Sequence, residues 1–203
     1  MRTDTERPRR GRPPAYDRDR ALGAIRDVFW RTGLSATSLD ELAAAAGMNR
    51  PSLYGAFGDK RAMYLAAMAL FAADLARVIG RALAEPRLDA ALGRFYAAII
   101  DVHLGGPDGP RGCFASGTAP VEAAQDPAVR DALAAVFDDL DAGLAARLRR
   151  AQADGEIAAD ADPAMLAKVA AAVVHSLALR ARAGTPRAEL EAMADQARRL
   201  IAG

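Results

Sequence analysis

The sequence predicts an all-α protein of about nine helices. The chain has 203 residues, of which 52% are hydrophobic and only 5% aromatic. Much of the hydrophobic share is alanine, which has the highest helix propensity. No segment alternates β-branched and polar residues as a half-buried strand does. Capping residues, glycines and prolines instead divide the chain into segments with helical periodicity, so we expect helices throughout.

Caps and glycines predict three helices near the N-terminus, over residues 17–33, 38–47 and 49–58. The spacing of Ser38 and Glu41 is that of a capping box, in which the serine bonds forward and the glutamate reaches back. A glycine at the end of each segment suits the left-handed conformation that often terminates a helix. We therefore expect short helices with tight connections.

Longer helices are predicted in the remaining sequence. Asp59 caps the first of them, and Pro86 breaks it after Ala84. Asp162 and Thr185 each precede a proline, which is typical of a capped helix start. The segments expected in this part are 59–84, 88–104, 112–125, 127–153 and the two that begin at Pro163 and Pro186.

The charges are unevenly distributed, although the net charge is only +1. Residues 1–64 carry 12 Lys and Arg against 8 Asp and Glu, and residues 65–203 carry 15 against 18. A positive N-terminal part joined to a slightly acidic remainder suits a protein that binds phosphates at one end.

Two short helices with a glycine turn between them, over 39–46 and 50–57, match a helix-turn-helix. In such a unit the second helix enters the major groove with its N-terminal residues first. Arg50 suits a guanine edge or a phosphate, Tyr54 suits a phosphate, and Lys60 suits the DNA backbone. Helix pairs of this kind also occur in proteins that never touch DNA, so a purely structural role stays open at this point.

Three segments resemble the signature of the TetR family of bacterial regulators: TSLDELA (37–43), AGMNRPSLY (46–54) and FGDK (57–60). The resemblance covers about residues 17–64, and it departs at Gly55-Ala56, where many members carry an aromatic residue or histidine. It implies DNA-contacting positions, to which we add the two helix caps. The candidate contacts are Thr37, Ser38, Asn49, Arg50, Ser52, Tyr54 and Lys60.

The resemblance implies an N-terminal three-helix DNA-binding domain followed by a C-terminal helical domain for ligand binding and dimerisation. We place the DNA-binding domain at residues 16–64, with the helix-turn-helix at about 38–57, and the second domain at 65–203. Residues 1–15 are expected to be a disordered basic arm. Its Arg-Gly-Arg-Pro run is similar to an AT-hook, which lies in a narrow A·T minor groove. The alternative is a solvated tail, and the arginines concerned are Arg9, Arg10 and Arg12.

In the family the last two helices pair with those of a second copy, and the sequence here suits a homodimer. The alternative is that both helices complete a monomeric core. The candidate interface residues are Leu166, Val169, Val173, Leu177, Leu190, Met193, Ala197 and Leu200.

A pocket for a small-molecule effector of unknown identity is expected among the middle helices, although each candidate alone also suits ordinary core. The candidates are Phe95, Ile99, His103, Cys113, Phe114, Thr118, Phe137 and His175. The two histidines and the cysteine lie on three different predicted helices without metal-ligand spacing, so we expect no metal and no cofactor.

Cys113 is the single cysteine, which excludes an intrachain disulfide and fits a reducing compartment. It follows Gly112 at a predicted helix start beside Arg111, and both features lower the pKa of a thiol. The Gly-Cys-Phe segment also resembles one branch of the family, some members of which respond to electrophiles or metals. We nevertheless expect a buried, unreactive cysteine, and a reactive thiolate is the alternative.

The expected location is the cytoplasm, without membrane contact. The basic N-terminus lacks the apolar region of a secretory signal, and residues 164–179 are interrupted by Lys168, His175 and Ser176. We expect a repressor that binds a palindromic operator as a dimer and is released by an inducer. An activator, an adaptor and a helical ligand-binding protein or enzyme without DNA binding are the alternatives, although no phosphate loop, paired carboxylates or nucleophile with a base is evident.

Overall fold

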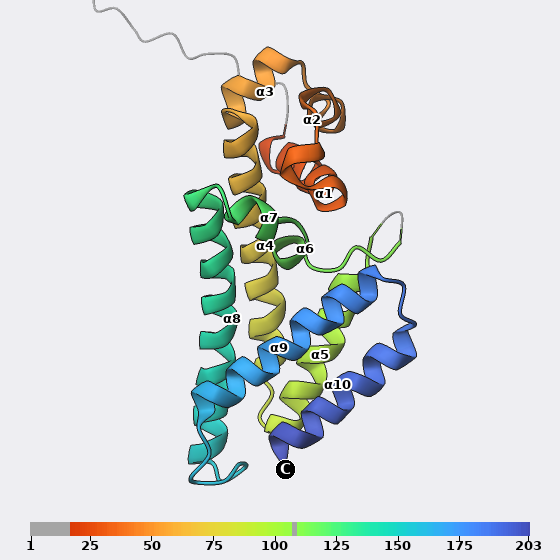
Figure 1. Ribbon diagram of the computed structural model, residues 1–203. Helices are drawn as coiled ribbons and strands as arrows, with labels where there is room; N and C mark the ends of the chain where they lie inside the picture. Colours follow the sequence, from red (N-terminus) through yellow and green to blue (C-terminus); the bar gives the residue numbers. More distant parts are fainter. Residues whose placement is uncertain (1–16, 107–108) are drawn as a thin grey trace, which may run out of the picture.

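The computed structural model describes residues 17–106 and 109–203, and the regular elements in these ranges are all α-helices (Figure 1). They number ten, against about nine expected from the caps and breaks. The helices are α1 Arg18–Ala36, α2 Leu39–Ala46, α3 Arg50–Phe57, α4 Lys60–Leu83, α5 Leu88–Leu104, α6 Phe114–Thr118, α7 Pro120–Ala123, α8 Pro127–Ala153, α9 Pro163–Arg182 and α10 Arg187–Ala202.

The additional helix comes from a break at Pro120. A single helix was expected over 112–125, but α6 ends at Thr118 and α7 begins with Pro120. Proline has no N–H to donate within a helix and is favoured at the first helical position, so it begins a new element instead of continuing the old one.

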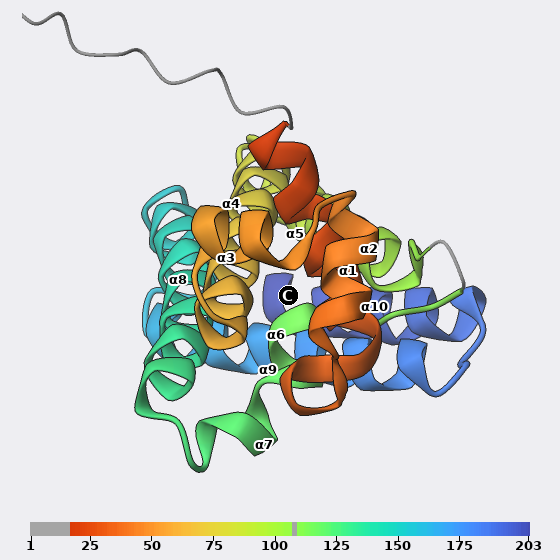
Figure 2. The same ribbon diagram turned by 90° about the horizontal axis from the view of Figure 1, so that it is seen from above.

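Helices α1–α3, which we call the head, cap one end of a helical bundle (Figure 2). Asp17 caps α1 by accepting hydrogen bonds from the backbone N–H groups of Asp19 and Arg20. α1 continues to Ala36 across a kink at Gly33, whose φ of 77° is readily adopted by glycine. The backbone of Gly33 is non-helical, with ψ 179°, so the expected helix end near Gly33 is confirmed, and a short second helical segment follows it within the range of α1.

The predicted capping box and turn of the helix-turn-helix are confirmed. The Ser38 hydroxyl accepts from the Glu41 N–H at 3.2 Å, and the Glu41 carboxylate accepts from the Ser38 N–H at 2.7 Å. Gly47 ends α2 in the left-handed conformation, with φ 64°. Asn49 caps α3 by accepting from the Ser52 N–H at 2.9 Å. These local bonds fix where α2 begins and ends and where α3 begins.

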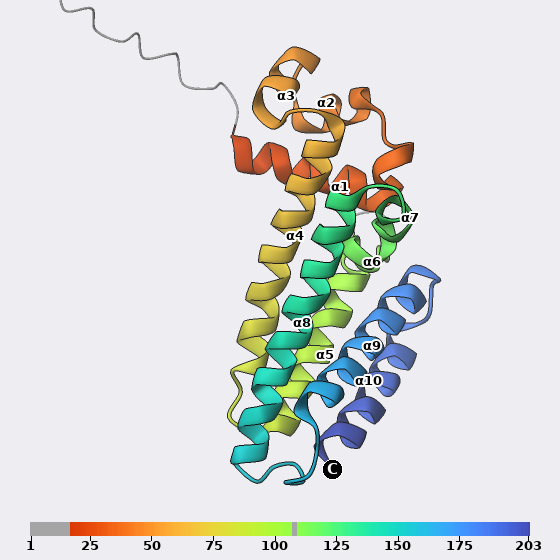
Figure 3. The ribbon, with the colours of Figure 1, turned by 60° about the vertical axis from the view of Figure 1, so that its left-hand side comes forward.

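Helices α5–α10, which we call the body, form the bundle at the other end, and α4 joins head and body without interruption (Figures 1 and 3). α4 lies beside α8, and α9 packs on α5, α8 and α10. The C-terminus lies at the end of the bundle opposite to α3. α4 begins at Lys60, so the predicted domain boundary between residues 64 and 65 falls inside a continuous helix.

Aromatic rings fill the junction of head and body. The Trp30 ring of α1 meets Phe71 of α4 at 5.1 Å and Phe114 of α6 at 5.7 Å between centroids. Phe114 also packs on Tyr64 at 5.5 Å. The head is therefore joined to the body by a buried hydrophobic cluster as well as by the chain of α4.

α4 and α9 are both long and apolar enough to cross a membrane by length and composition, with 33% and 39% of the apolar window buried. α9 has 20 residues, and its apolar part, residues 164–179, is interrupted by Lys168, His175 and Ser176. Core helices of soluble proteins pass the same test. α4 packs on α1, α5 and α8, and α9 packs on α5, α8 and α10, so each buries one face within the bundle.

Candidate nucleic-acid interface

The outer face of α3 presents polar side chains at the tip of the head. Leu53 and Phe57 point into the core, while Arg50, Ser52 and Tyr54 are exposed. The hydroxyls of Ser52 and Tyr54 make no hydrogen bond within the described part of the chain. This arrangement leaves one face of a short helix free to enter a groove.

Arg50 is held by a carboxylate of the preceding helix, a contact that the sequence analysis missed. Its Nε donates to Asp40 Oδ1 at 2.7 Å and its Nη2 to Asp40 Oδ2 at 2.6 Å. This bond holds the pKa of Asp40 below its ordinary value. The side chains of Arg50 and Asp40 are 56% and 72% exposed, so the carboxylate is easily exchanged for another acceptor. In the structure, however, the two donors suited to a guanine edge are already occupied.

The prediction that Thr37 contacts DNA is wrong for its side chain. The residue is only 2% exposed, and its hydroxyl donates to the Gly33 carbonyl at 2.6 Å. Lys60 is also engaged, because its Nζ donates to the carbonyls of Ser35 at 3.4 Å and Thr37 at 3.0 Å. These bonds tie the α1–α2 connection to the start of α4.

The other predicted contacts divide into two groups. Ser38 and Asn49 are exposed, and their side chains serve as helix caps. The three arginines of the predicted arm, Arg9, Arg10 and Arg12, lie outside the described residues.

The predicted effector pocket is closely packed. Phe95, Ile99, His103 and Phe114 are at most 2% exposed, and Thr118 bonds to the Tyr64 hydroxyl at 2.7 Å. Burial lowers the pKa of His103 to about 4, so its imidazole is neutral at pH 7. Phe137 and His175 stack on each other with ring centroids 4.6 Å apart.

A cavity of about 450 Å³ lies instead between α4 and α8, and none of the eight predicted residues lines it. Its walls are mostly apolar or small. They comprise Ala72, Leu75, Ala76, Ile79, Gly80, Leu83, Val136, Asp139, Leu140 and Gly143. Four of these are alanine or glycine. The cavity is therefore open because the two facing helices carry no large side chains at these positions.

The expectation of a lowered thiol pKa at Cys113 is wrong in this conformation. Cys113 is 7% exposed, and burial raises its pKa. The neighbouring Arg111 places its guanidinium over the Trp30 ring, 3.6 Å from the centroid. The structure therefore favours a buried, unreactive cysteine.

The predicted dimer interface is partly wrong. Leu177, Leu190 and Ala197 are at most 9% exposed within their own chain and cannot form a seam with a second copy. Leu166, Val173 and Met193 are half-buried in the core. The exposed residues of α9 include an apolar stripe with helical spacing, Met165, Val169, Ala172 and Leu179, and charged residues such as Lys168 and Arg180 are exposed beside it. Leu200 of α10 is 74% exposed.

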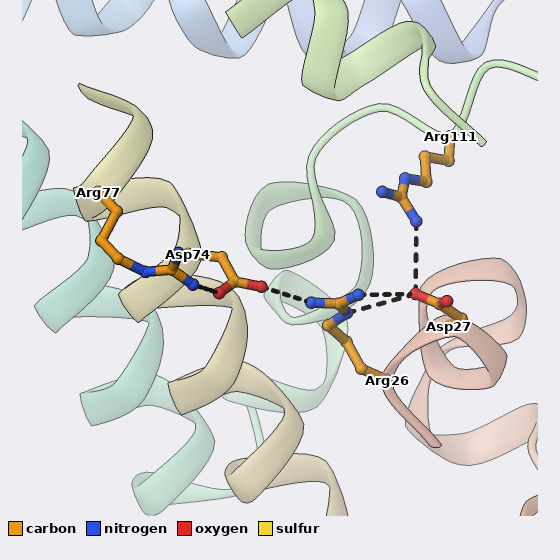
Figure 4. A network of polar contacts seen from close by, with 5 residues as sticks. All are labelled: Arg26, Asp27, Asp74, Arg77 and Arg111. Carbon is orange, nitrogen blue, oxygen red and sulfur yellow. Dashed lines mark hydrogen bonds and ion pairs between the residues drawn. The ribbon is translucent and has the colours of Figure 1, made fainter. Parts of the chain in front are cut away.

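An ion-pair network joins α1 of the head to α4 and to the segment that follows α5 (Figure 4). Arg26 binds Asp74 of α4 at 2.7 Å and its neighbour Asp27 at 3.2 Å. Arg77 also binds Asp74, and Arg111 reaches Asp27 at 3.4 Å. The head is thus linked electrostatically to two separate parts of the molecule.

Comparisons with known proteins give the same assignment for both ends of the chain. The family described as "Bacterial regulatory proteins, tetR family" matches residues 21–72, and "Tetracyclin repressor-like, C-terminal domain" matches residues 84–197. The HTH-type transcriptional repressor ComR of Escherichia coli (strain K12) is 30% identical over 200 residues, which cover 94% of this chain and 91% of the relative.

Solved structures agree with this assignment. A cysteine mutant of the TetR family transcriptional regulator CifR, complexed with 26bp double-strand operator DNA, has a TM-score of 0.85 and 34% identity, covering 93% of this chain and 98% of that one. A TetR transcriptional regulator from Rhodococcus sp. RHA1 is 30% identical with a TM-score of 0.60, covering 90% and 97%. The relatives are transcriptional regulators, and CifR is complexed with operator DNA, so the comparisons support a DNA-binding regulator and not the enzyme alternative. The chain belongs to the TetR family of bacterial transcriptional regulators.

Proposed function

We propose that this protein is a cytoplasmic repressor that binds a palindromic operator as a homodimer and is released by a small-molecule effector. The observation that carries the proposal is the exposed face of α3, with Arg50, Ser52 and Tyr54 at the tip of the head. Residues 16–64 would bind DNA and 65–203 would bind the effector and the second copy. Family membership supports this division, since a repressor role and a response to ligands are typical of the family.

Within this function, we propose that the Asp40 carboxylate holds the Arg50 side chain until a group of the DNA replaces the carboxylate as its acceptor. A phosphate or a guanine edge offers the same pair of acceptors as the carboxylate, so the exchange costs little at an exposed site.

Asp40→Asn should therefore strengthen binding to nonspecific DNA and steepen its salt dependence by about one phosphate contact. The operator is first selected from a random DNA pool with the purified protein. Affinities of the wild type, Asp40→Asn, Arg50→Ala and the double variant are then measured by fluorescence anisotropy across a salt series. Arg50→Ala should cost about 1–3 kcal/mol at one position of each half-site.

The double variant is the control for this prediction. Without Arg50, the Asp40→Asn change should leave the salt slope almost unaltered, because no arginine remains to be released. Equal changes of slope in both backgrounds would show that Asp40 acts on DNA directly and not through Arg50.

We further propose that the effector binds in the cavity between α4 and α8. A ligand there would contact α4, which continues into the head, so it can shift the head only by favouring another position of that helix. The cavity volume of about 450 Å³ suits a small, mainly apolar molecule.

Filling the cavity with Ala76→Trp should abolish ligand binding there while operator binding is retained. The fluorescent probe 8-anilinonaphthalene-1-sulfonate serves as the test ligand, because it binds apolar cavities. Its affinity should fall about tenfold or more in Ala76→Trp, because the indole would occupy the volume that the probe needs. Ala73→Trp, on an exposed position of α4 that does not line the cavity, is the matched control. Unchanged probe binding in Ala76→Trp would place the ligand site elsewhere.

A further inference from the structure

Gly55 lies in the middle of the exposed face of α3, the helix proposed to enter the major groove. Successive residues of an α-helix are turned by about 100°, so Gly55 lies about 160° around the axis from both Leu53 and Phe57, the buried residues of α3. No other residue of α3 lies so directly opposite to the core. This position is also where the sequence departs from the family signature.

The fold of the chain gives no reason for a glycine at this position. Gly55 is not among the glycines with positive φ, so other residues can adopt its backbone conformation. A Cβ added to it would meet no heavy atom within 4 Å beyond its chain neighbours and the backbone of its own helix. Glycine is also, after proline, the least favourable residue within a helix. A benefit of glycine here therefore has to come from a partner.

The residues around Gly55 make this part of the face shallow and apolar. Pro51 lies one turn before it on the same side of α3 and is exposed. Proline has no N–H donor and glycine has no side chain, so neither can offer a side-chain hydrogen bond to a base edge. Ser52 and Tyr54 place their hydroxyls on either side. Between them, the carbon atoms of the backbone and the Pro51 ring are open to close approach.

We propose that Gly55 is a specificity-determining position, at which the backbone of α3 contacts the methyl group of an operator thymine. Thymine is the base that carries a methyl group in the major groove, and apolar protein groups recognise it there. The methyl group occupies the space of the missing side chain and packs on the Pro51 ring. This inference rests on the function proposed above, because it requires α3 to lie in the major groove.

Replacing thymine by deoxyuridine removes only the methyl group and so tests this contact. The operator is first selected from a random DNA pool with the full-length wild type. Each thymine of one half-site is then replaced in turn, and affinities are measured by fluorescence anisotropy. One replacement should weaken wild-type binding about fourfold, the worth of one buried methyl group.

Gly55→Ala should bind the unmodified operator about tenfold more weakly than the wild type, because an added methyl group in a close contact forces the two surfaces apart. The same deoxyuridine that weakens the wild type should recover most of this loss in Gly55→Ala. The alanine and thymine methyl groups compete for one space, so removing either of them relieves the clash. A purely structural role of Gly55 would not produce this rescue.

Gly23→Ala is the matched control, because Gly23 is also a helical glycine of the head with open space at its Cβ position. It belongs to α1, which lies closer to the body than α2 and α3 do (Figures 1 and 3). Both alanines should raise the melting temperature by about 2–4 °C, the usual gain from this exchange within a helix. Only Gly55→Ala should bind the operator more weakly.

The outcomes separate this inference from the proposed function. If the wild type selects no operator, the proposed function fails and the inference falls with it. If the wild type selects an operator, three results would each overturn the inference alone: no thymine whose methyl group matters, wild-type affinity in Gly55→Ala, or a loss that deoxyuridine does not recover. An equal loss of affinity in Gly23→Ala would likewise overturn it, because the effect would then come from helix stability and not from a contact.

Discussion

Phe114→Ala should lower the free energy of unfolding by about 3–5 kcal/mol, the usual cost of removing a fully buried aromatic ring. The ring is 0% exposed and packs on Trp30, Tyr64 and Phe71. α6 has only five residues and cannot close the resulting space by sliding, because the next helix begins at Pro120. The cavity should therefore persist, and its cost adds to the lost transfer free energy.

Urea denaturation at fixed protein concentration, followed by circular dichroism and by Trp30 fluorescence, measures the effect. Because Trp30 lies against Phe114, separated transitions of the two signals would show that the head has come loose before the body unfolds. Phe137→Ala is the control, since Phe137 is only half-buried and lies away from this cluster. A loss below about 1 kcal/mol for Phe114→Ala would contradict the tight packing and favour the pocket role predicted from the sequence.

Val169→Asp should separate the homodimer and reduce operator affinity by about a hundredfold or more, because a monomer engages only one half-site. Val169 is 50% exposed in the middle of the apolar stripe of α9. A twofold axis at this stripe would bring two new carboxylates close together in an apolar seam, where burying unpaired charge is costly. The head of each monomer should remain folded.

Sedimentation velocity and anisotropy with the selected operator test this prediction. Val121→Asp is a matched control, because Val121 of α7 is 80% exposed and the same change there avoids α9. A Val169→Asp protein that stays dimeric and binds operator would place the seam elsewhere. Ala197→Asp, which the sequence pattern first suggested, is a poor test, because Ala197 is 9% exposed and the charge would disrupt its own core.

The helix-turn-helix was predictable because its determinants are local. Its helix ends are fixed by bonds that span at most four residues. The residues that make these bonds, and whose predicted capping roles the structure confirms, are Ser38, Glu41, Gly47 and Asn49. The break at Pro120 had the same kind of signal, which the sequence analysis overlooked.

Long-range features could not be obtained in this way. α9 is apolar on nearly every side, so the pattern alone could not decide that Leu177 points inward and Val169 outward. The cavity between α4 and α8 depends on small residues of two helices meeting, such as Ala76 and Gly143. The Arg50–Asp40 bond depends on the angle between α2 and α3. Each of these features is set by tertiary geometry, which the periodicity of the sequence does not reveal.

Because α4 runs unbroken from head to body, it also fixes how the head is rotated relative to the body about the axis of α4. Each residue of an α-helix adds a rise of about 1.5 Å and a turn of about 100°. Deleting one residue in the middle of α4 would therefore rotate the recognition face of α3 by more than a quarter of a circle about the helix axis. A deletion or insertion of seven residues would nearly restore the original direction, with a displacement of about 10 Å along the axis. Chimaeras that exchange heads between relatives thus have to preserve the residue count through Lys60–Leu83.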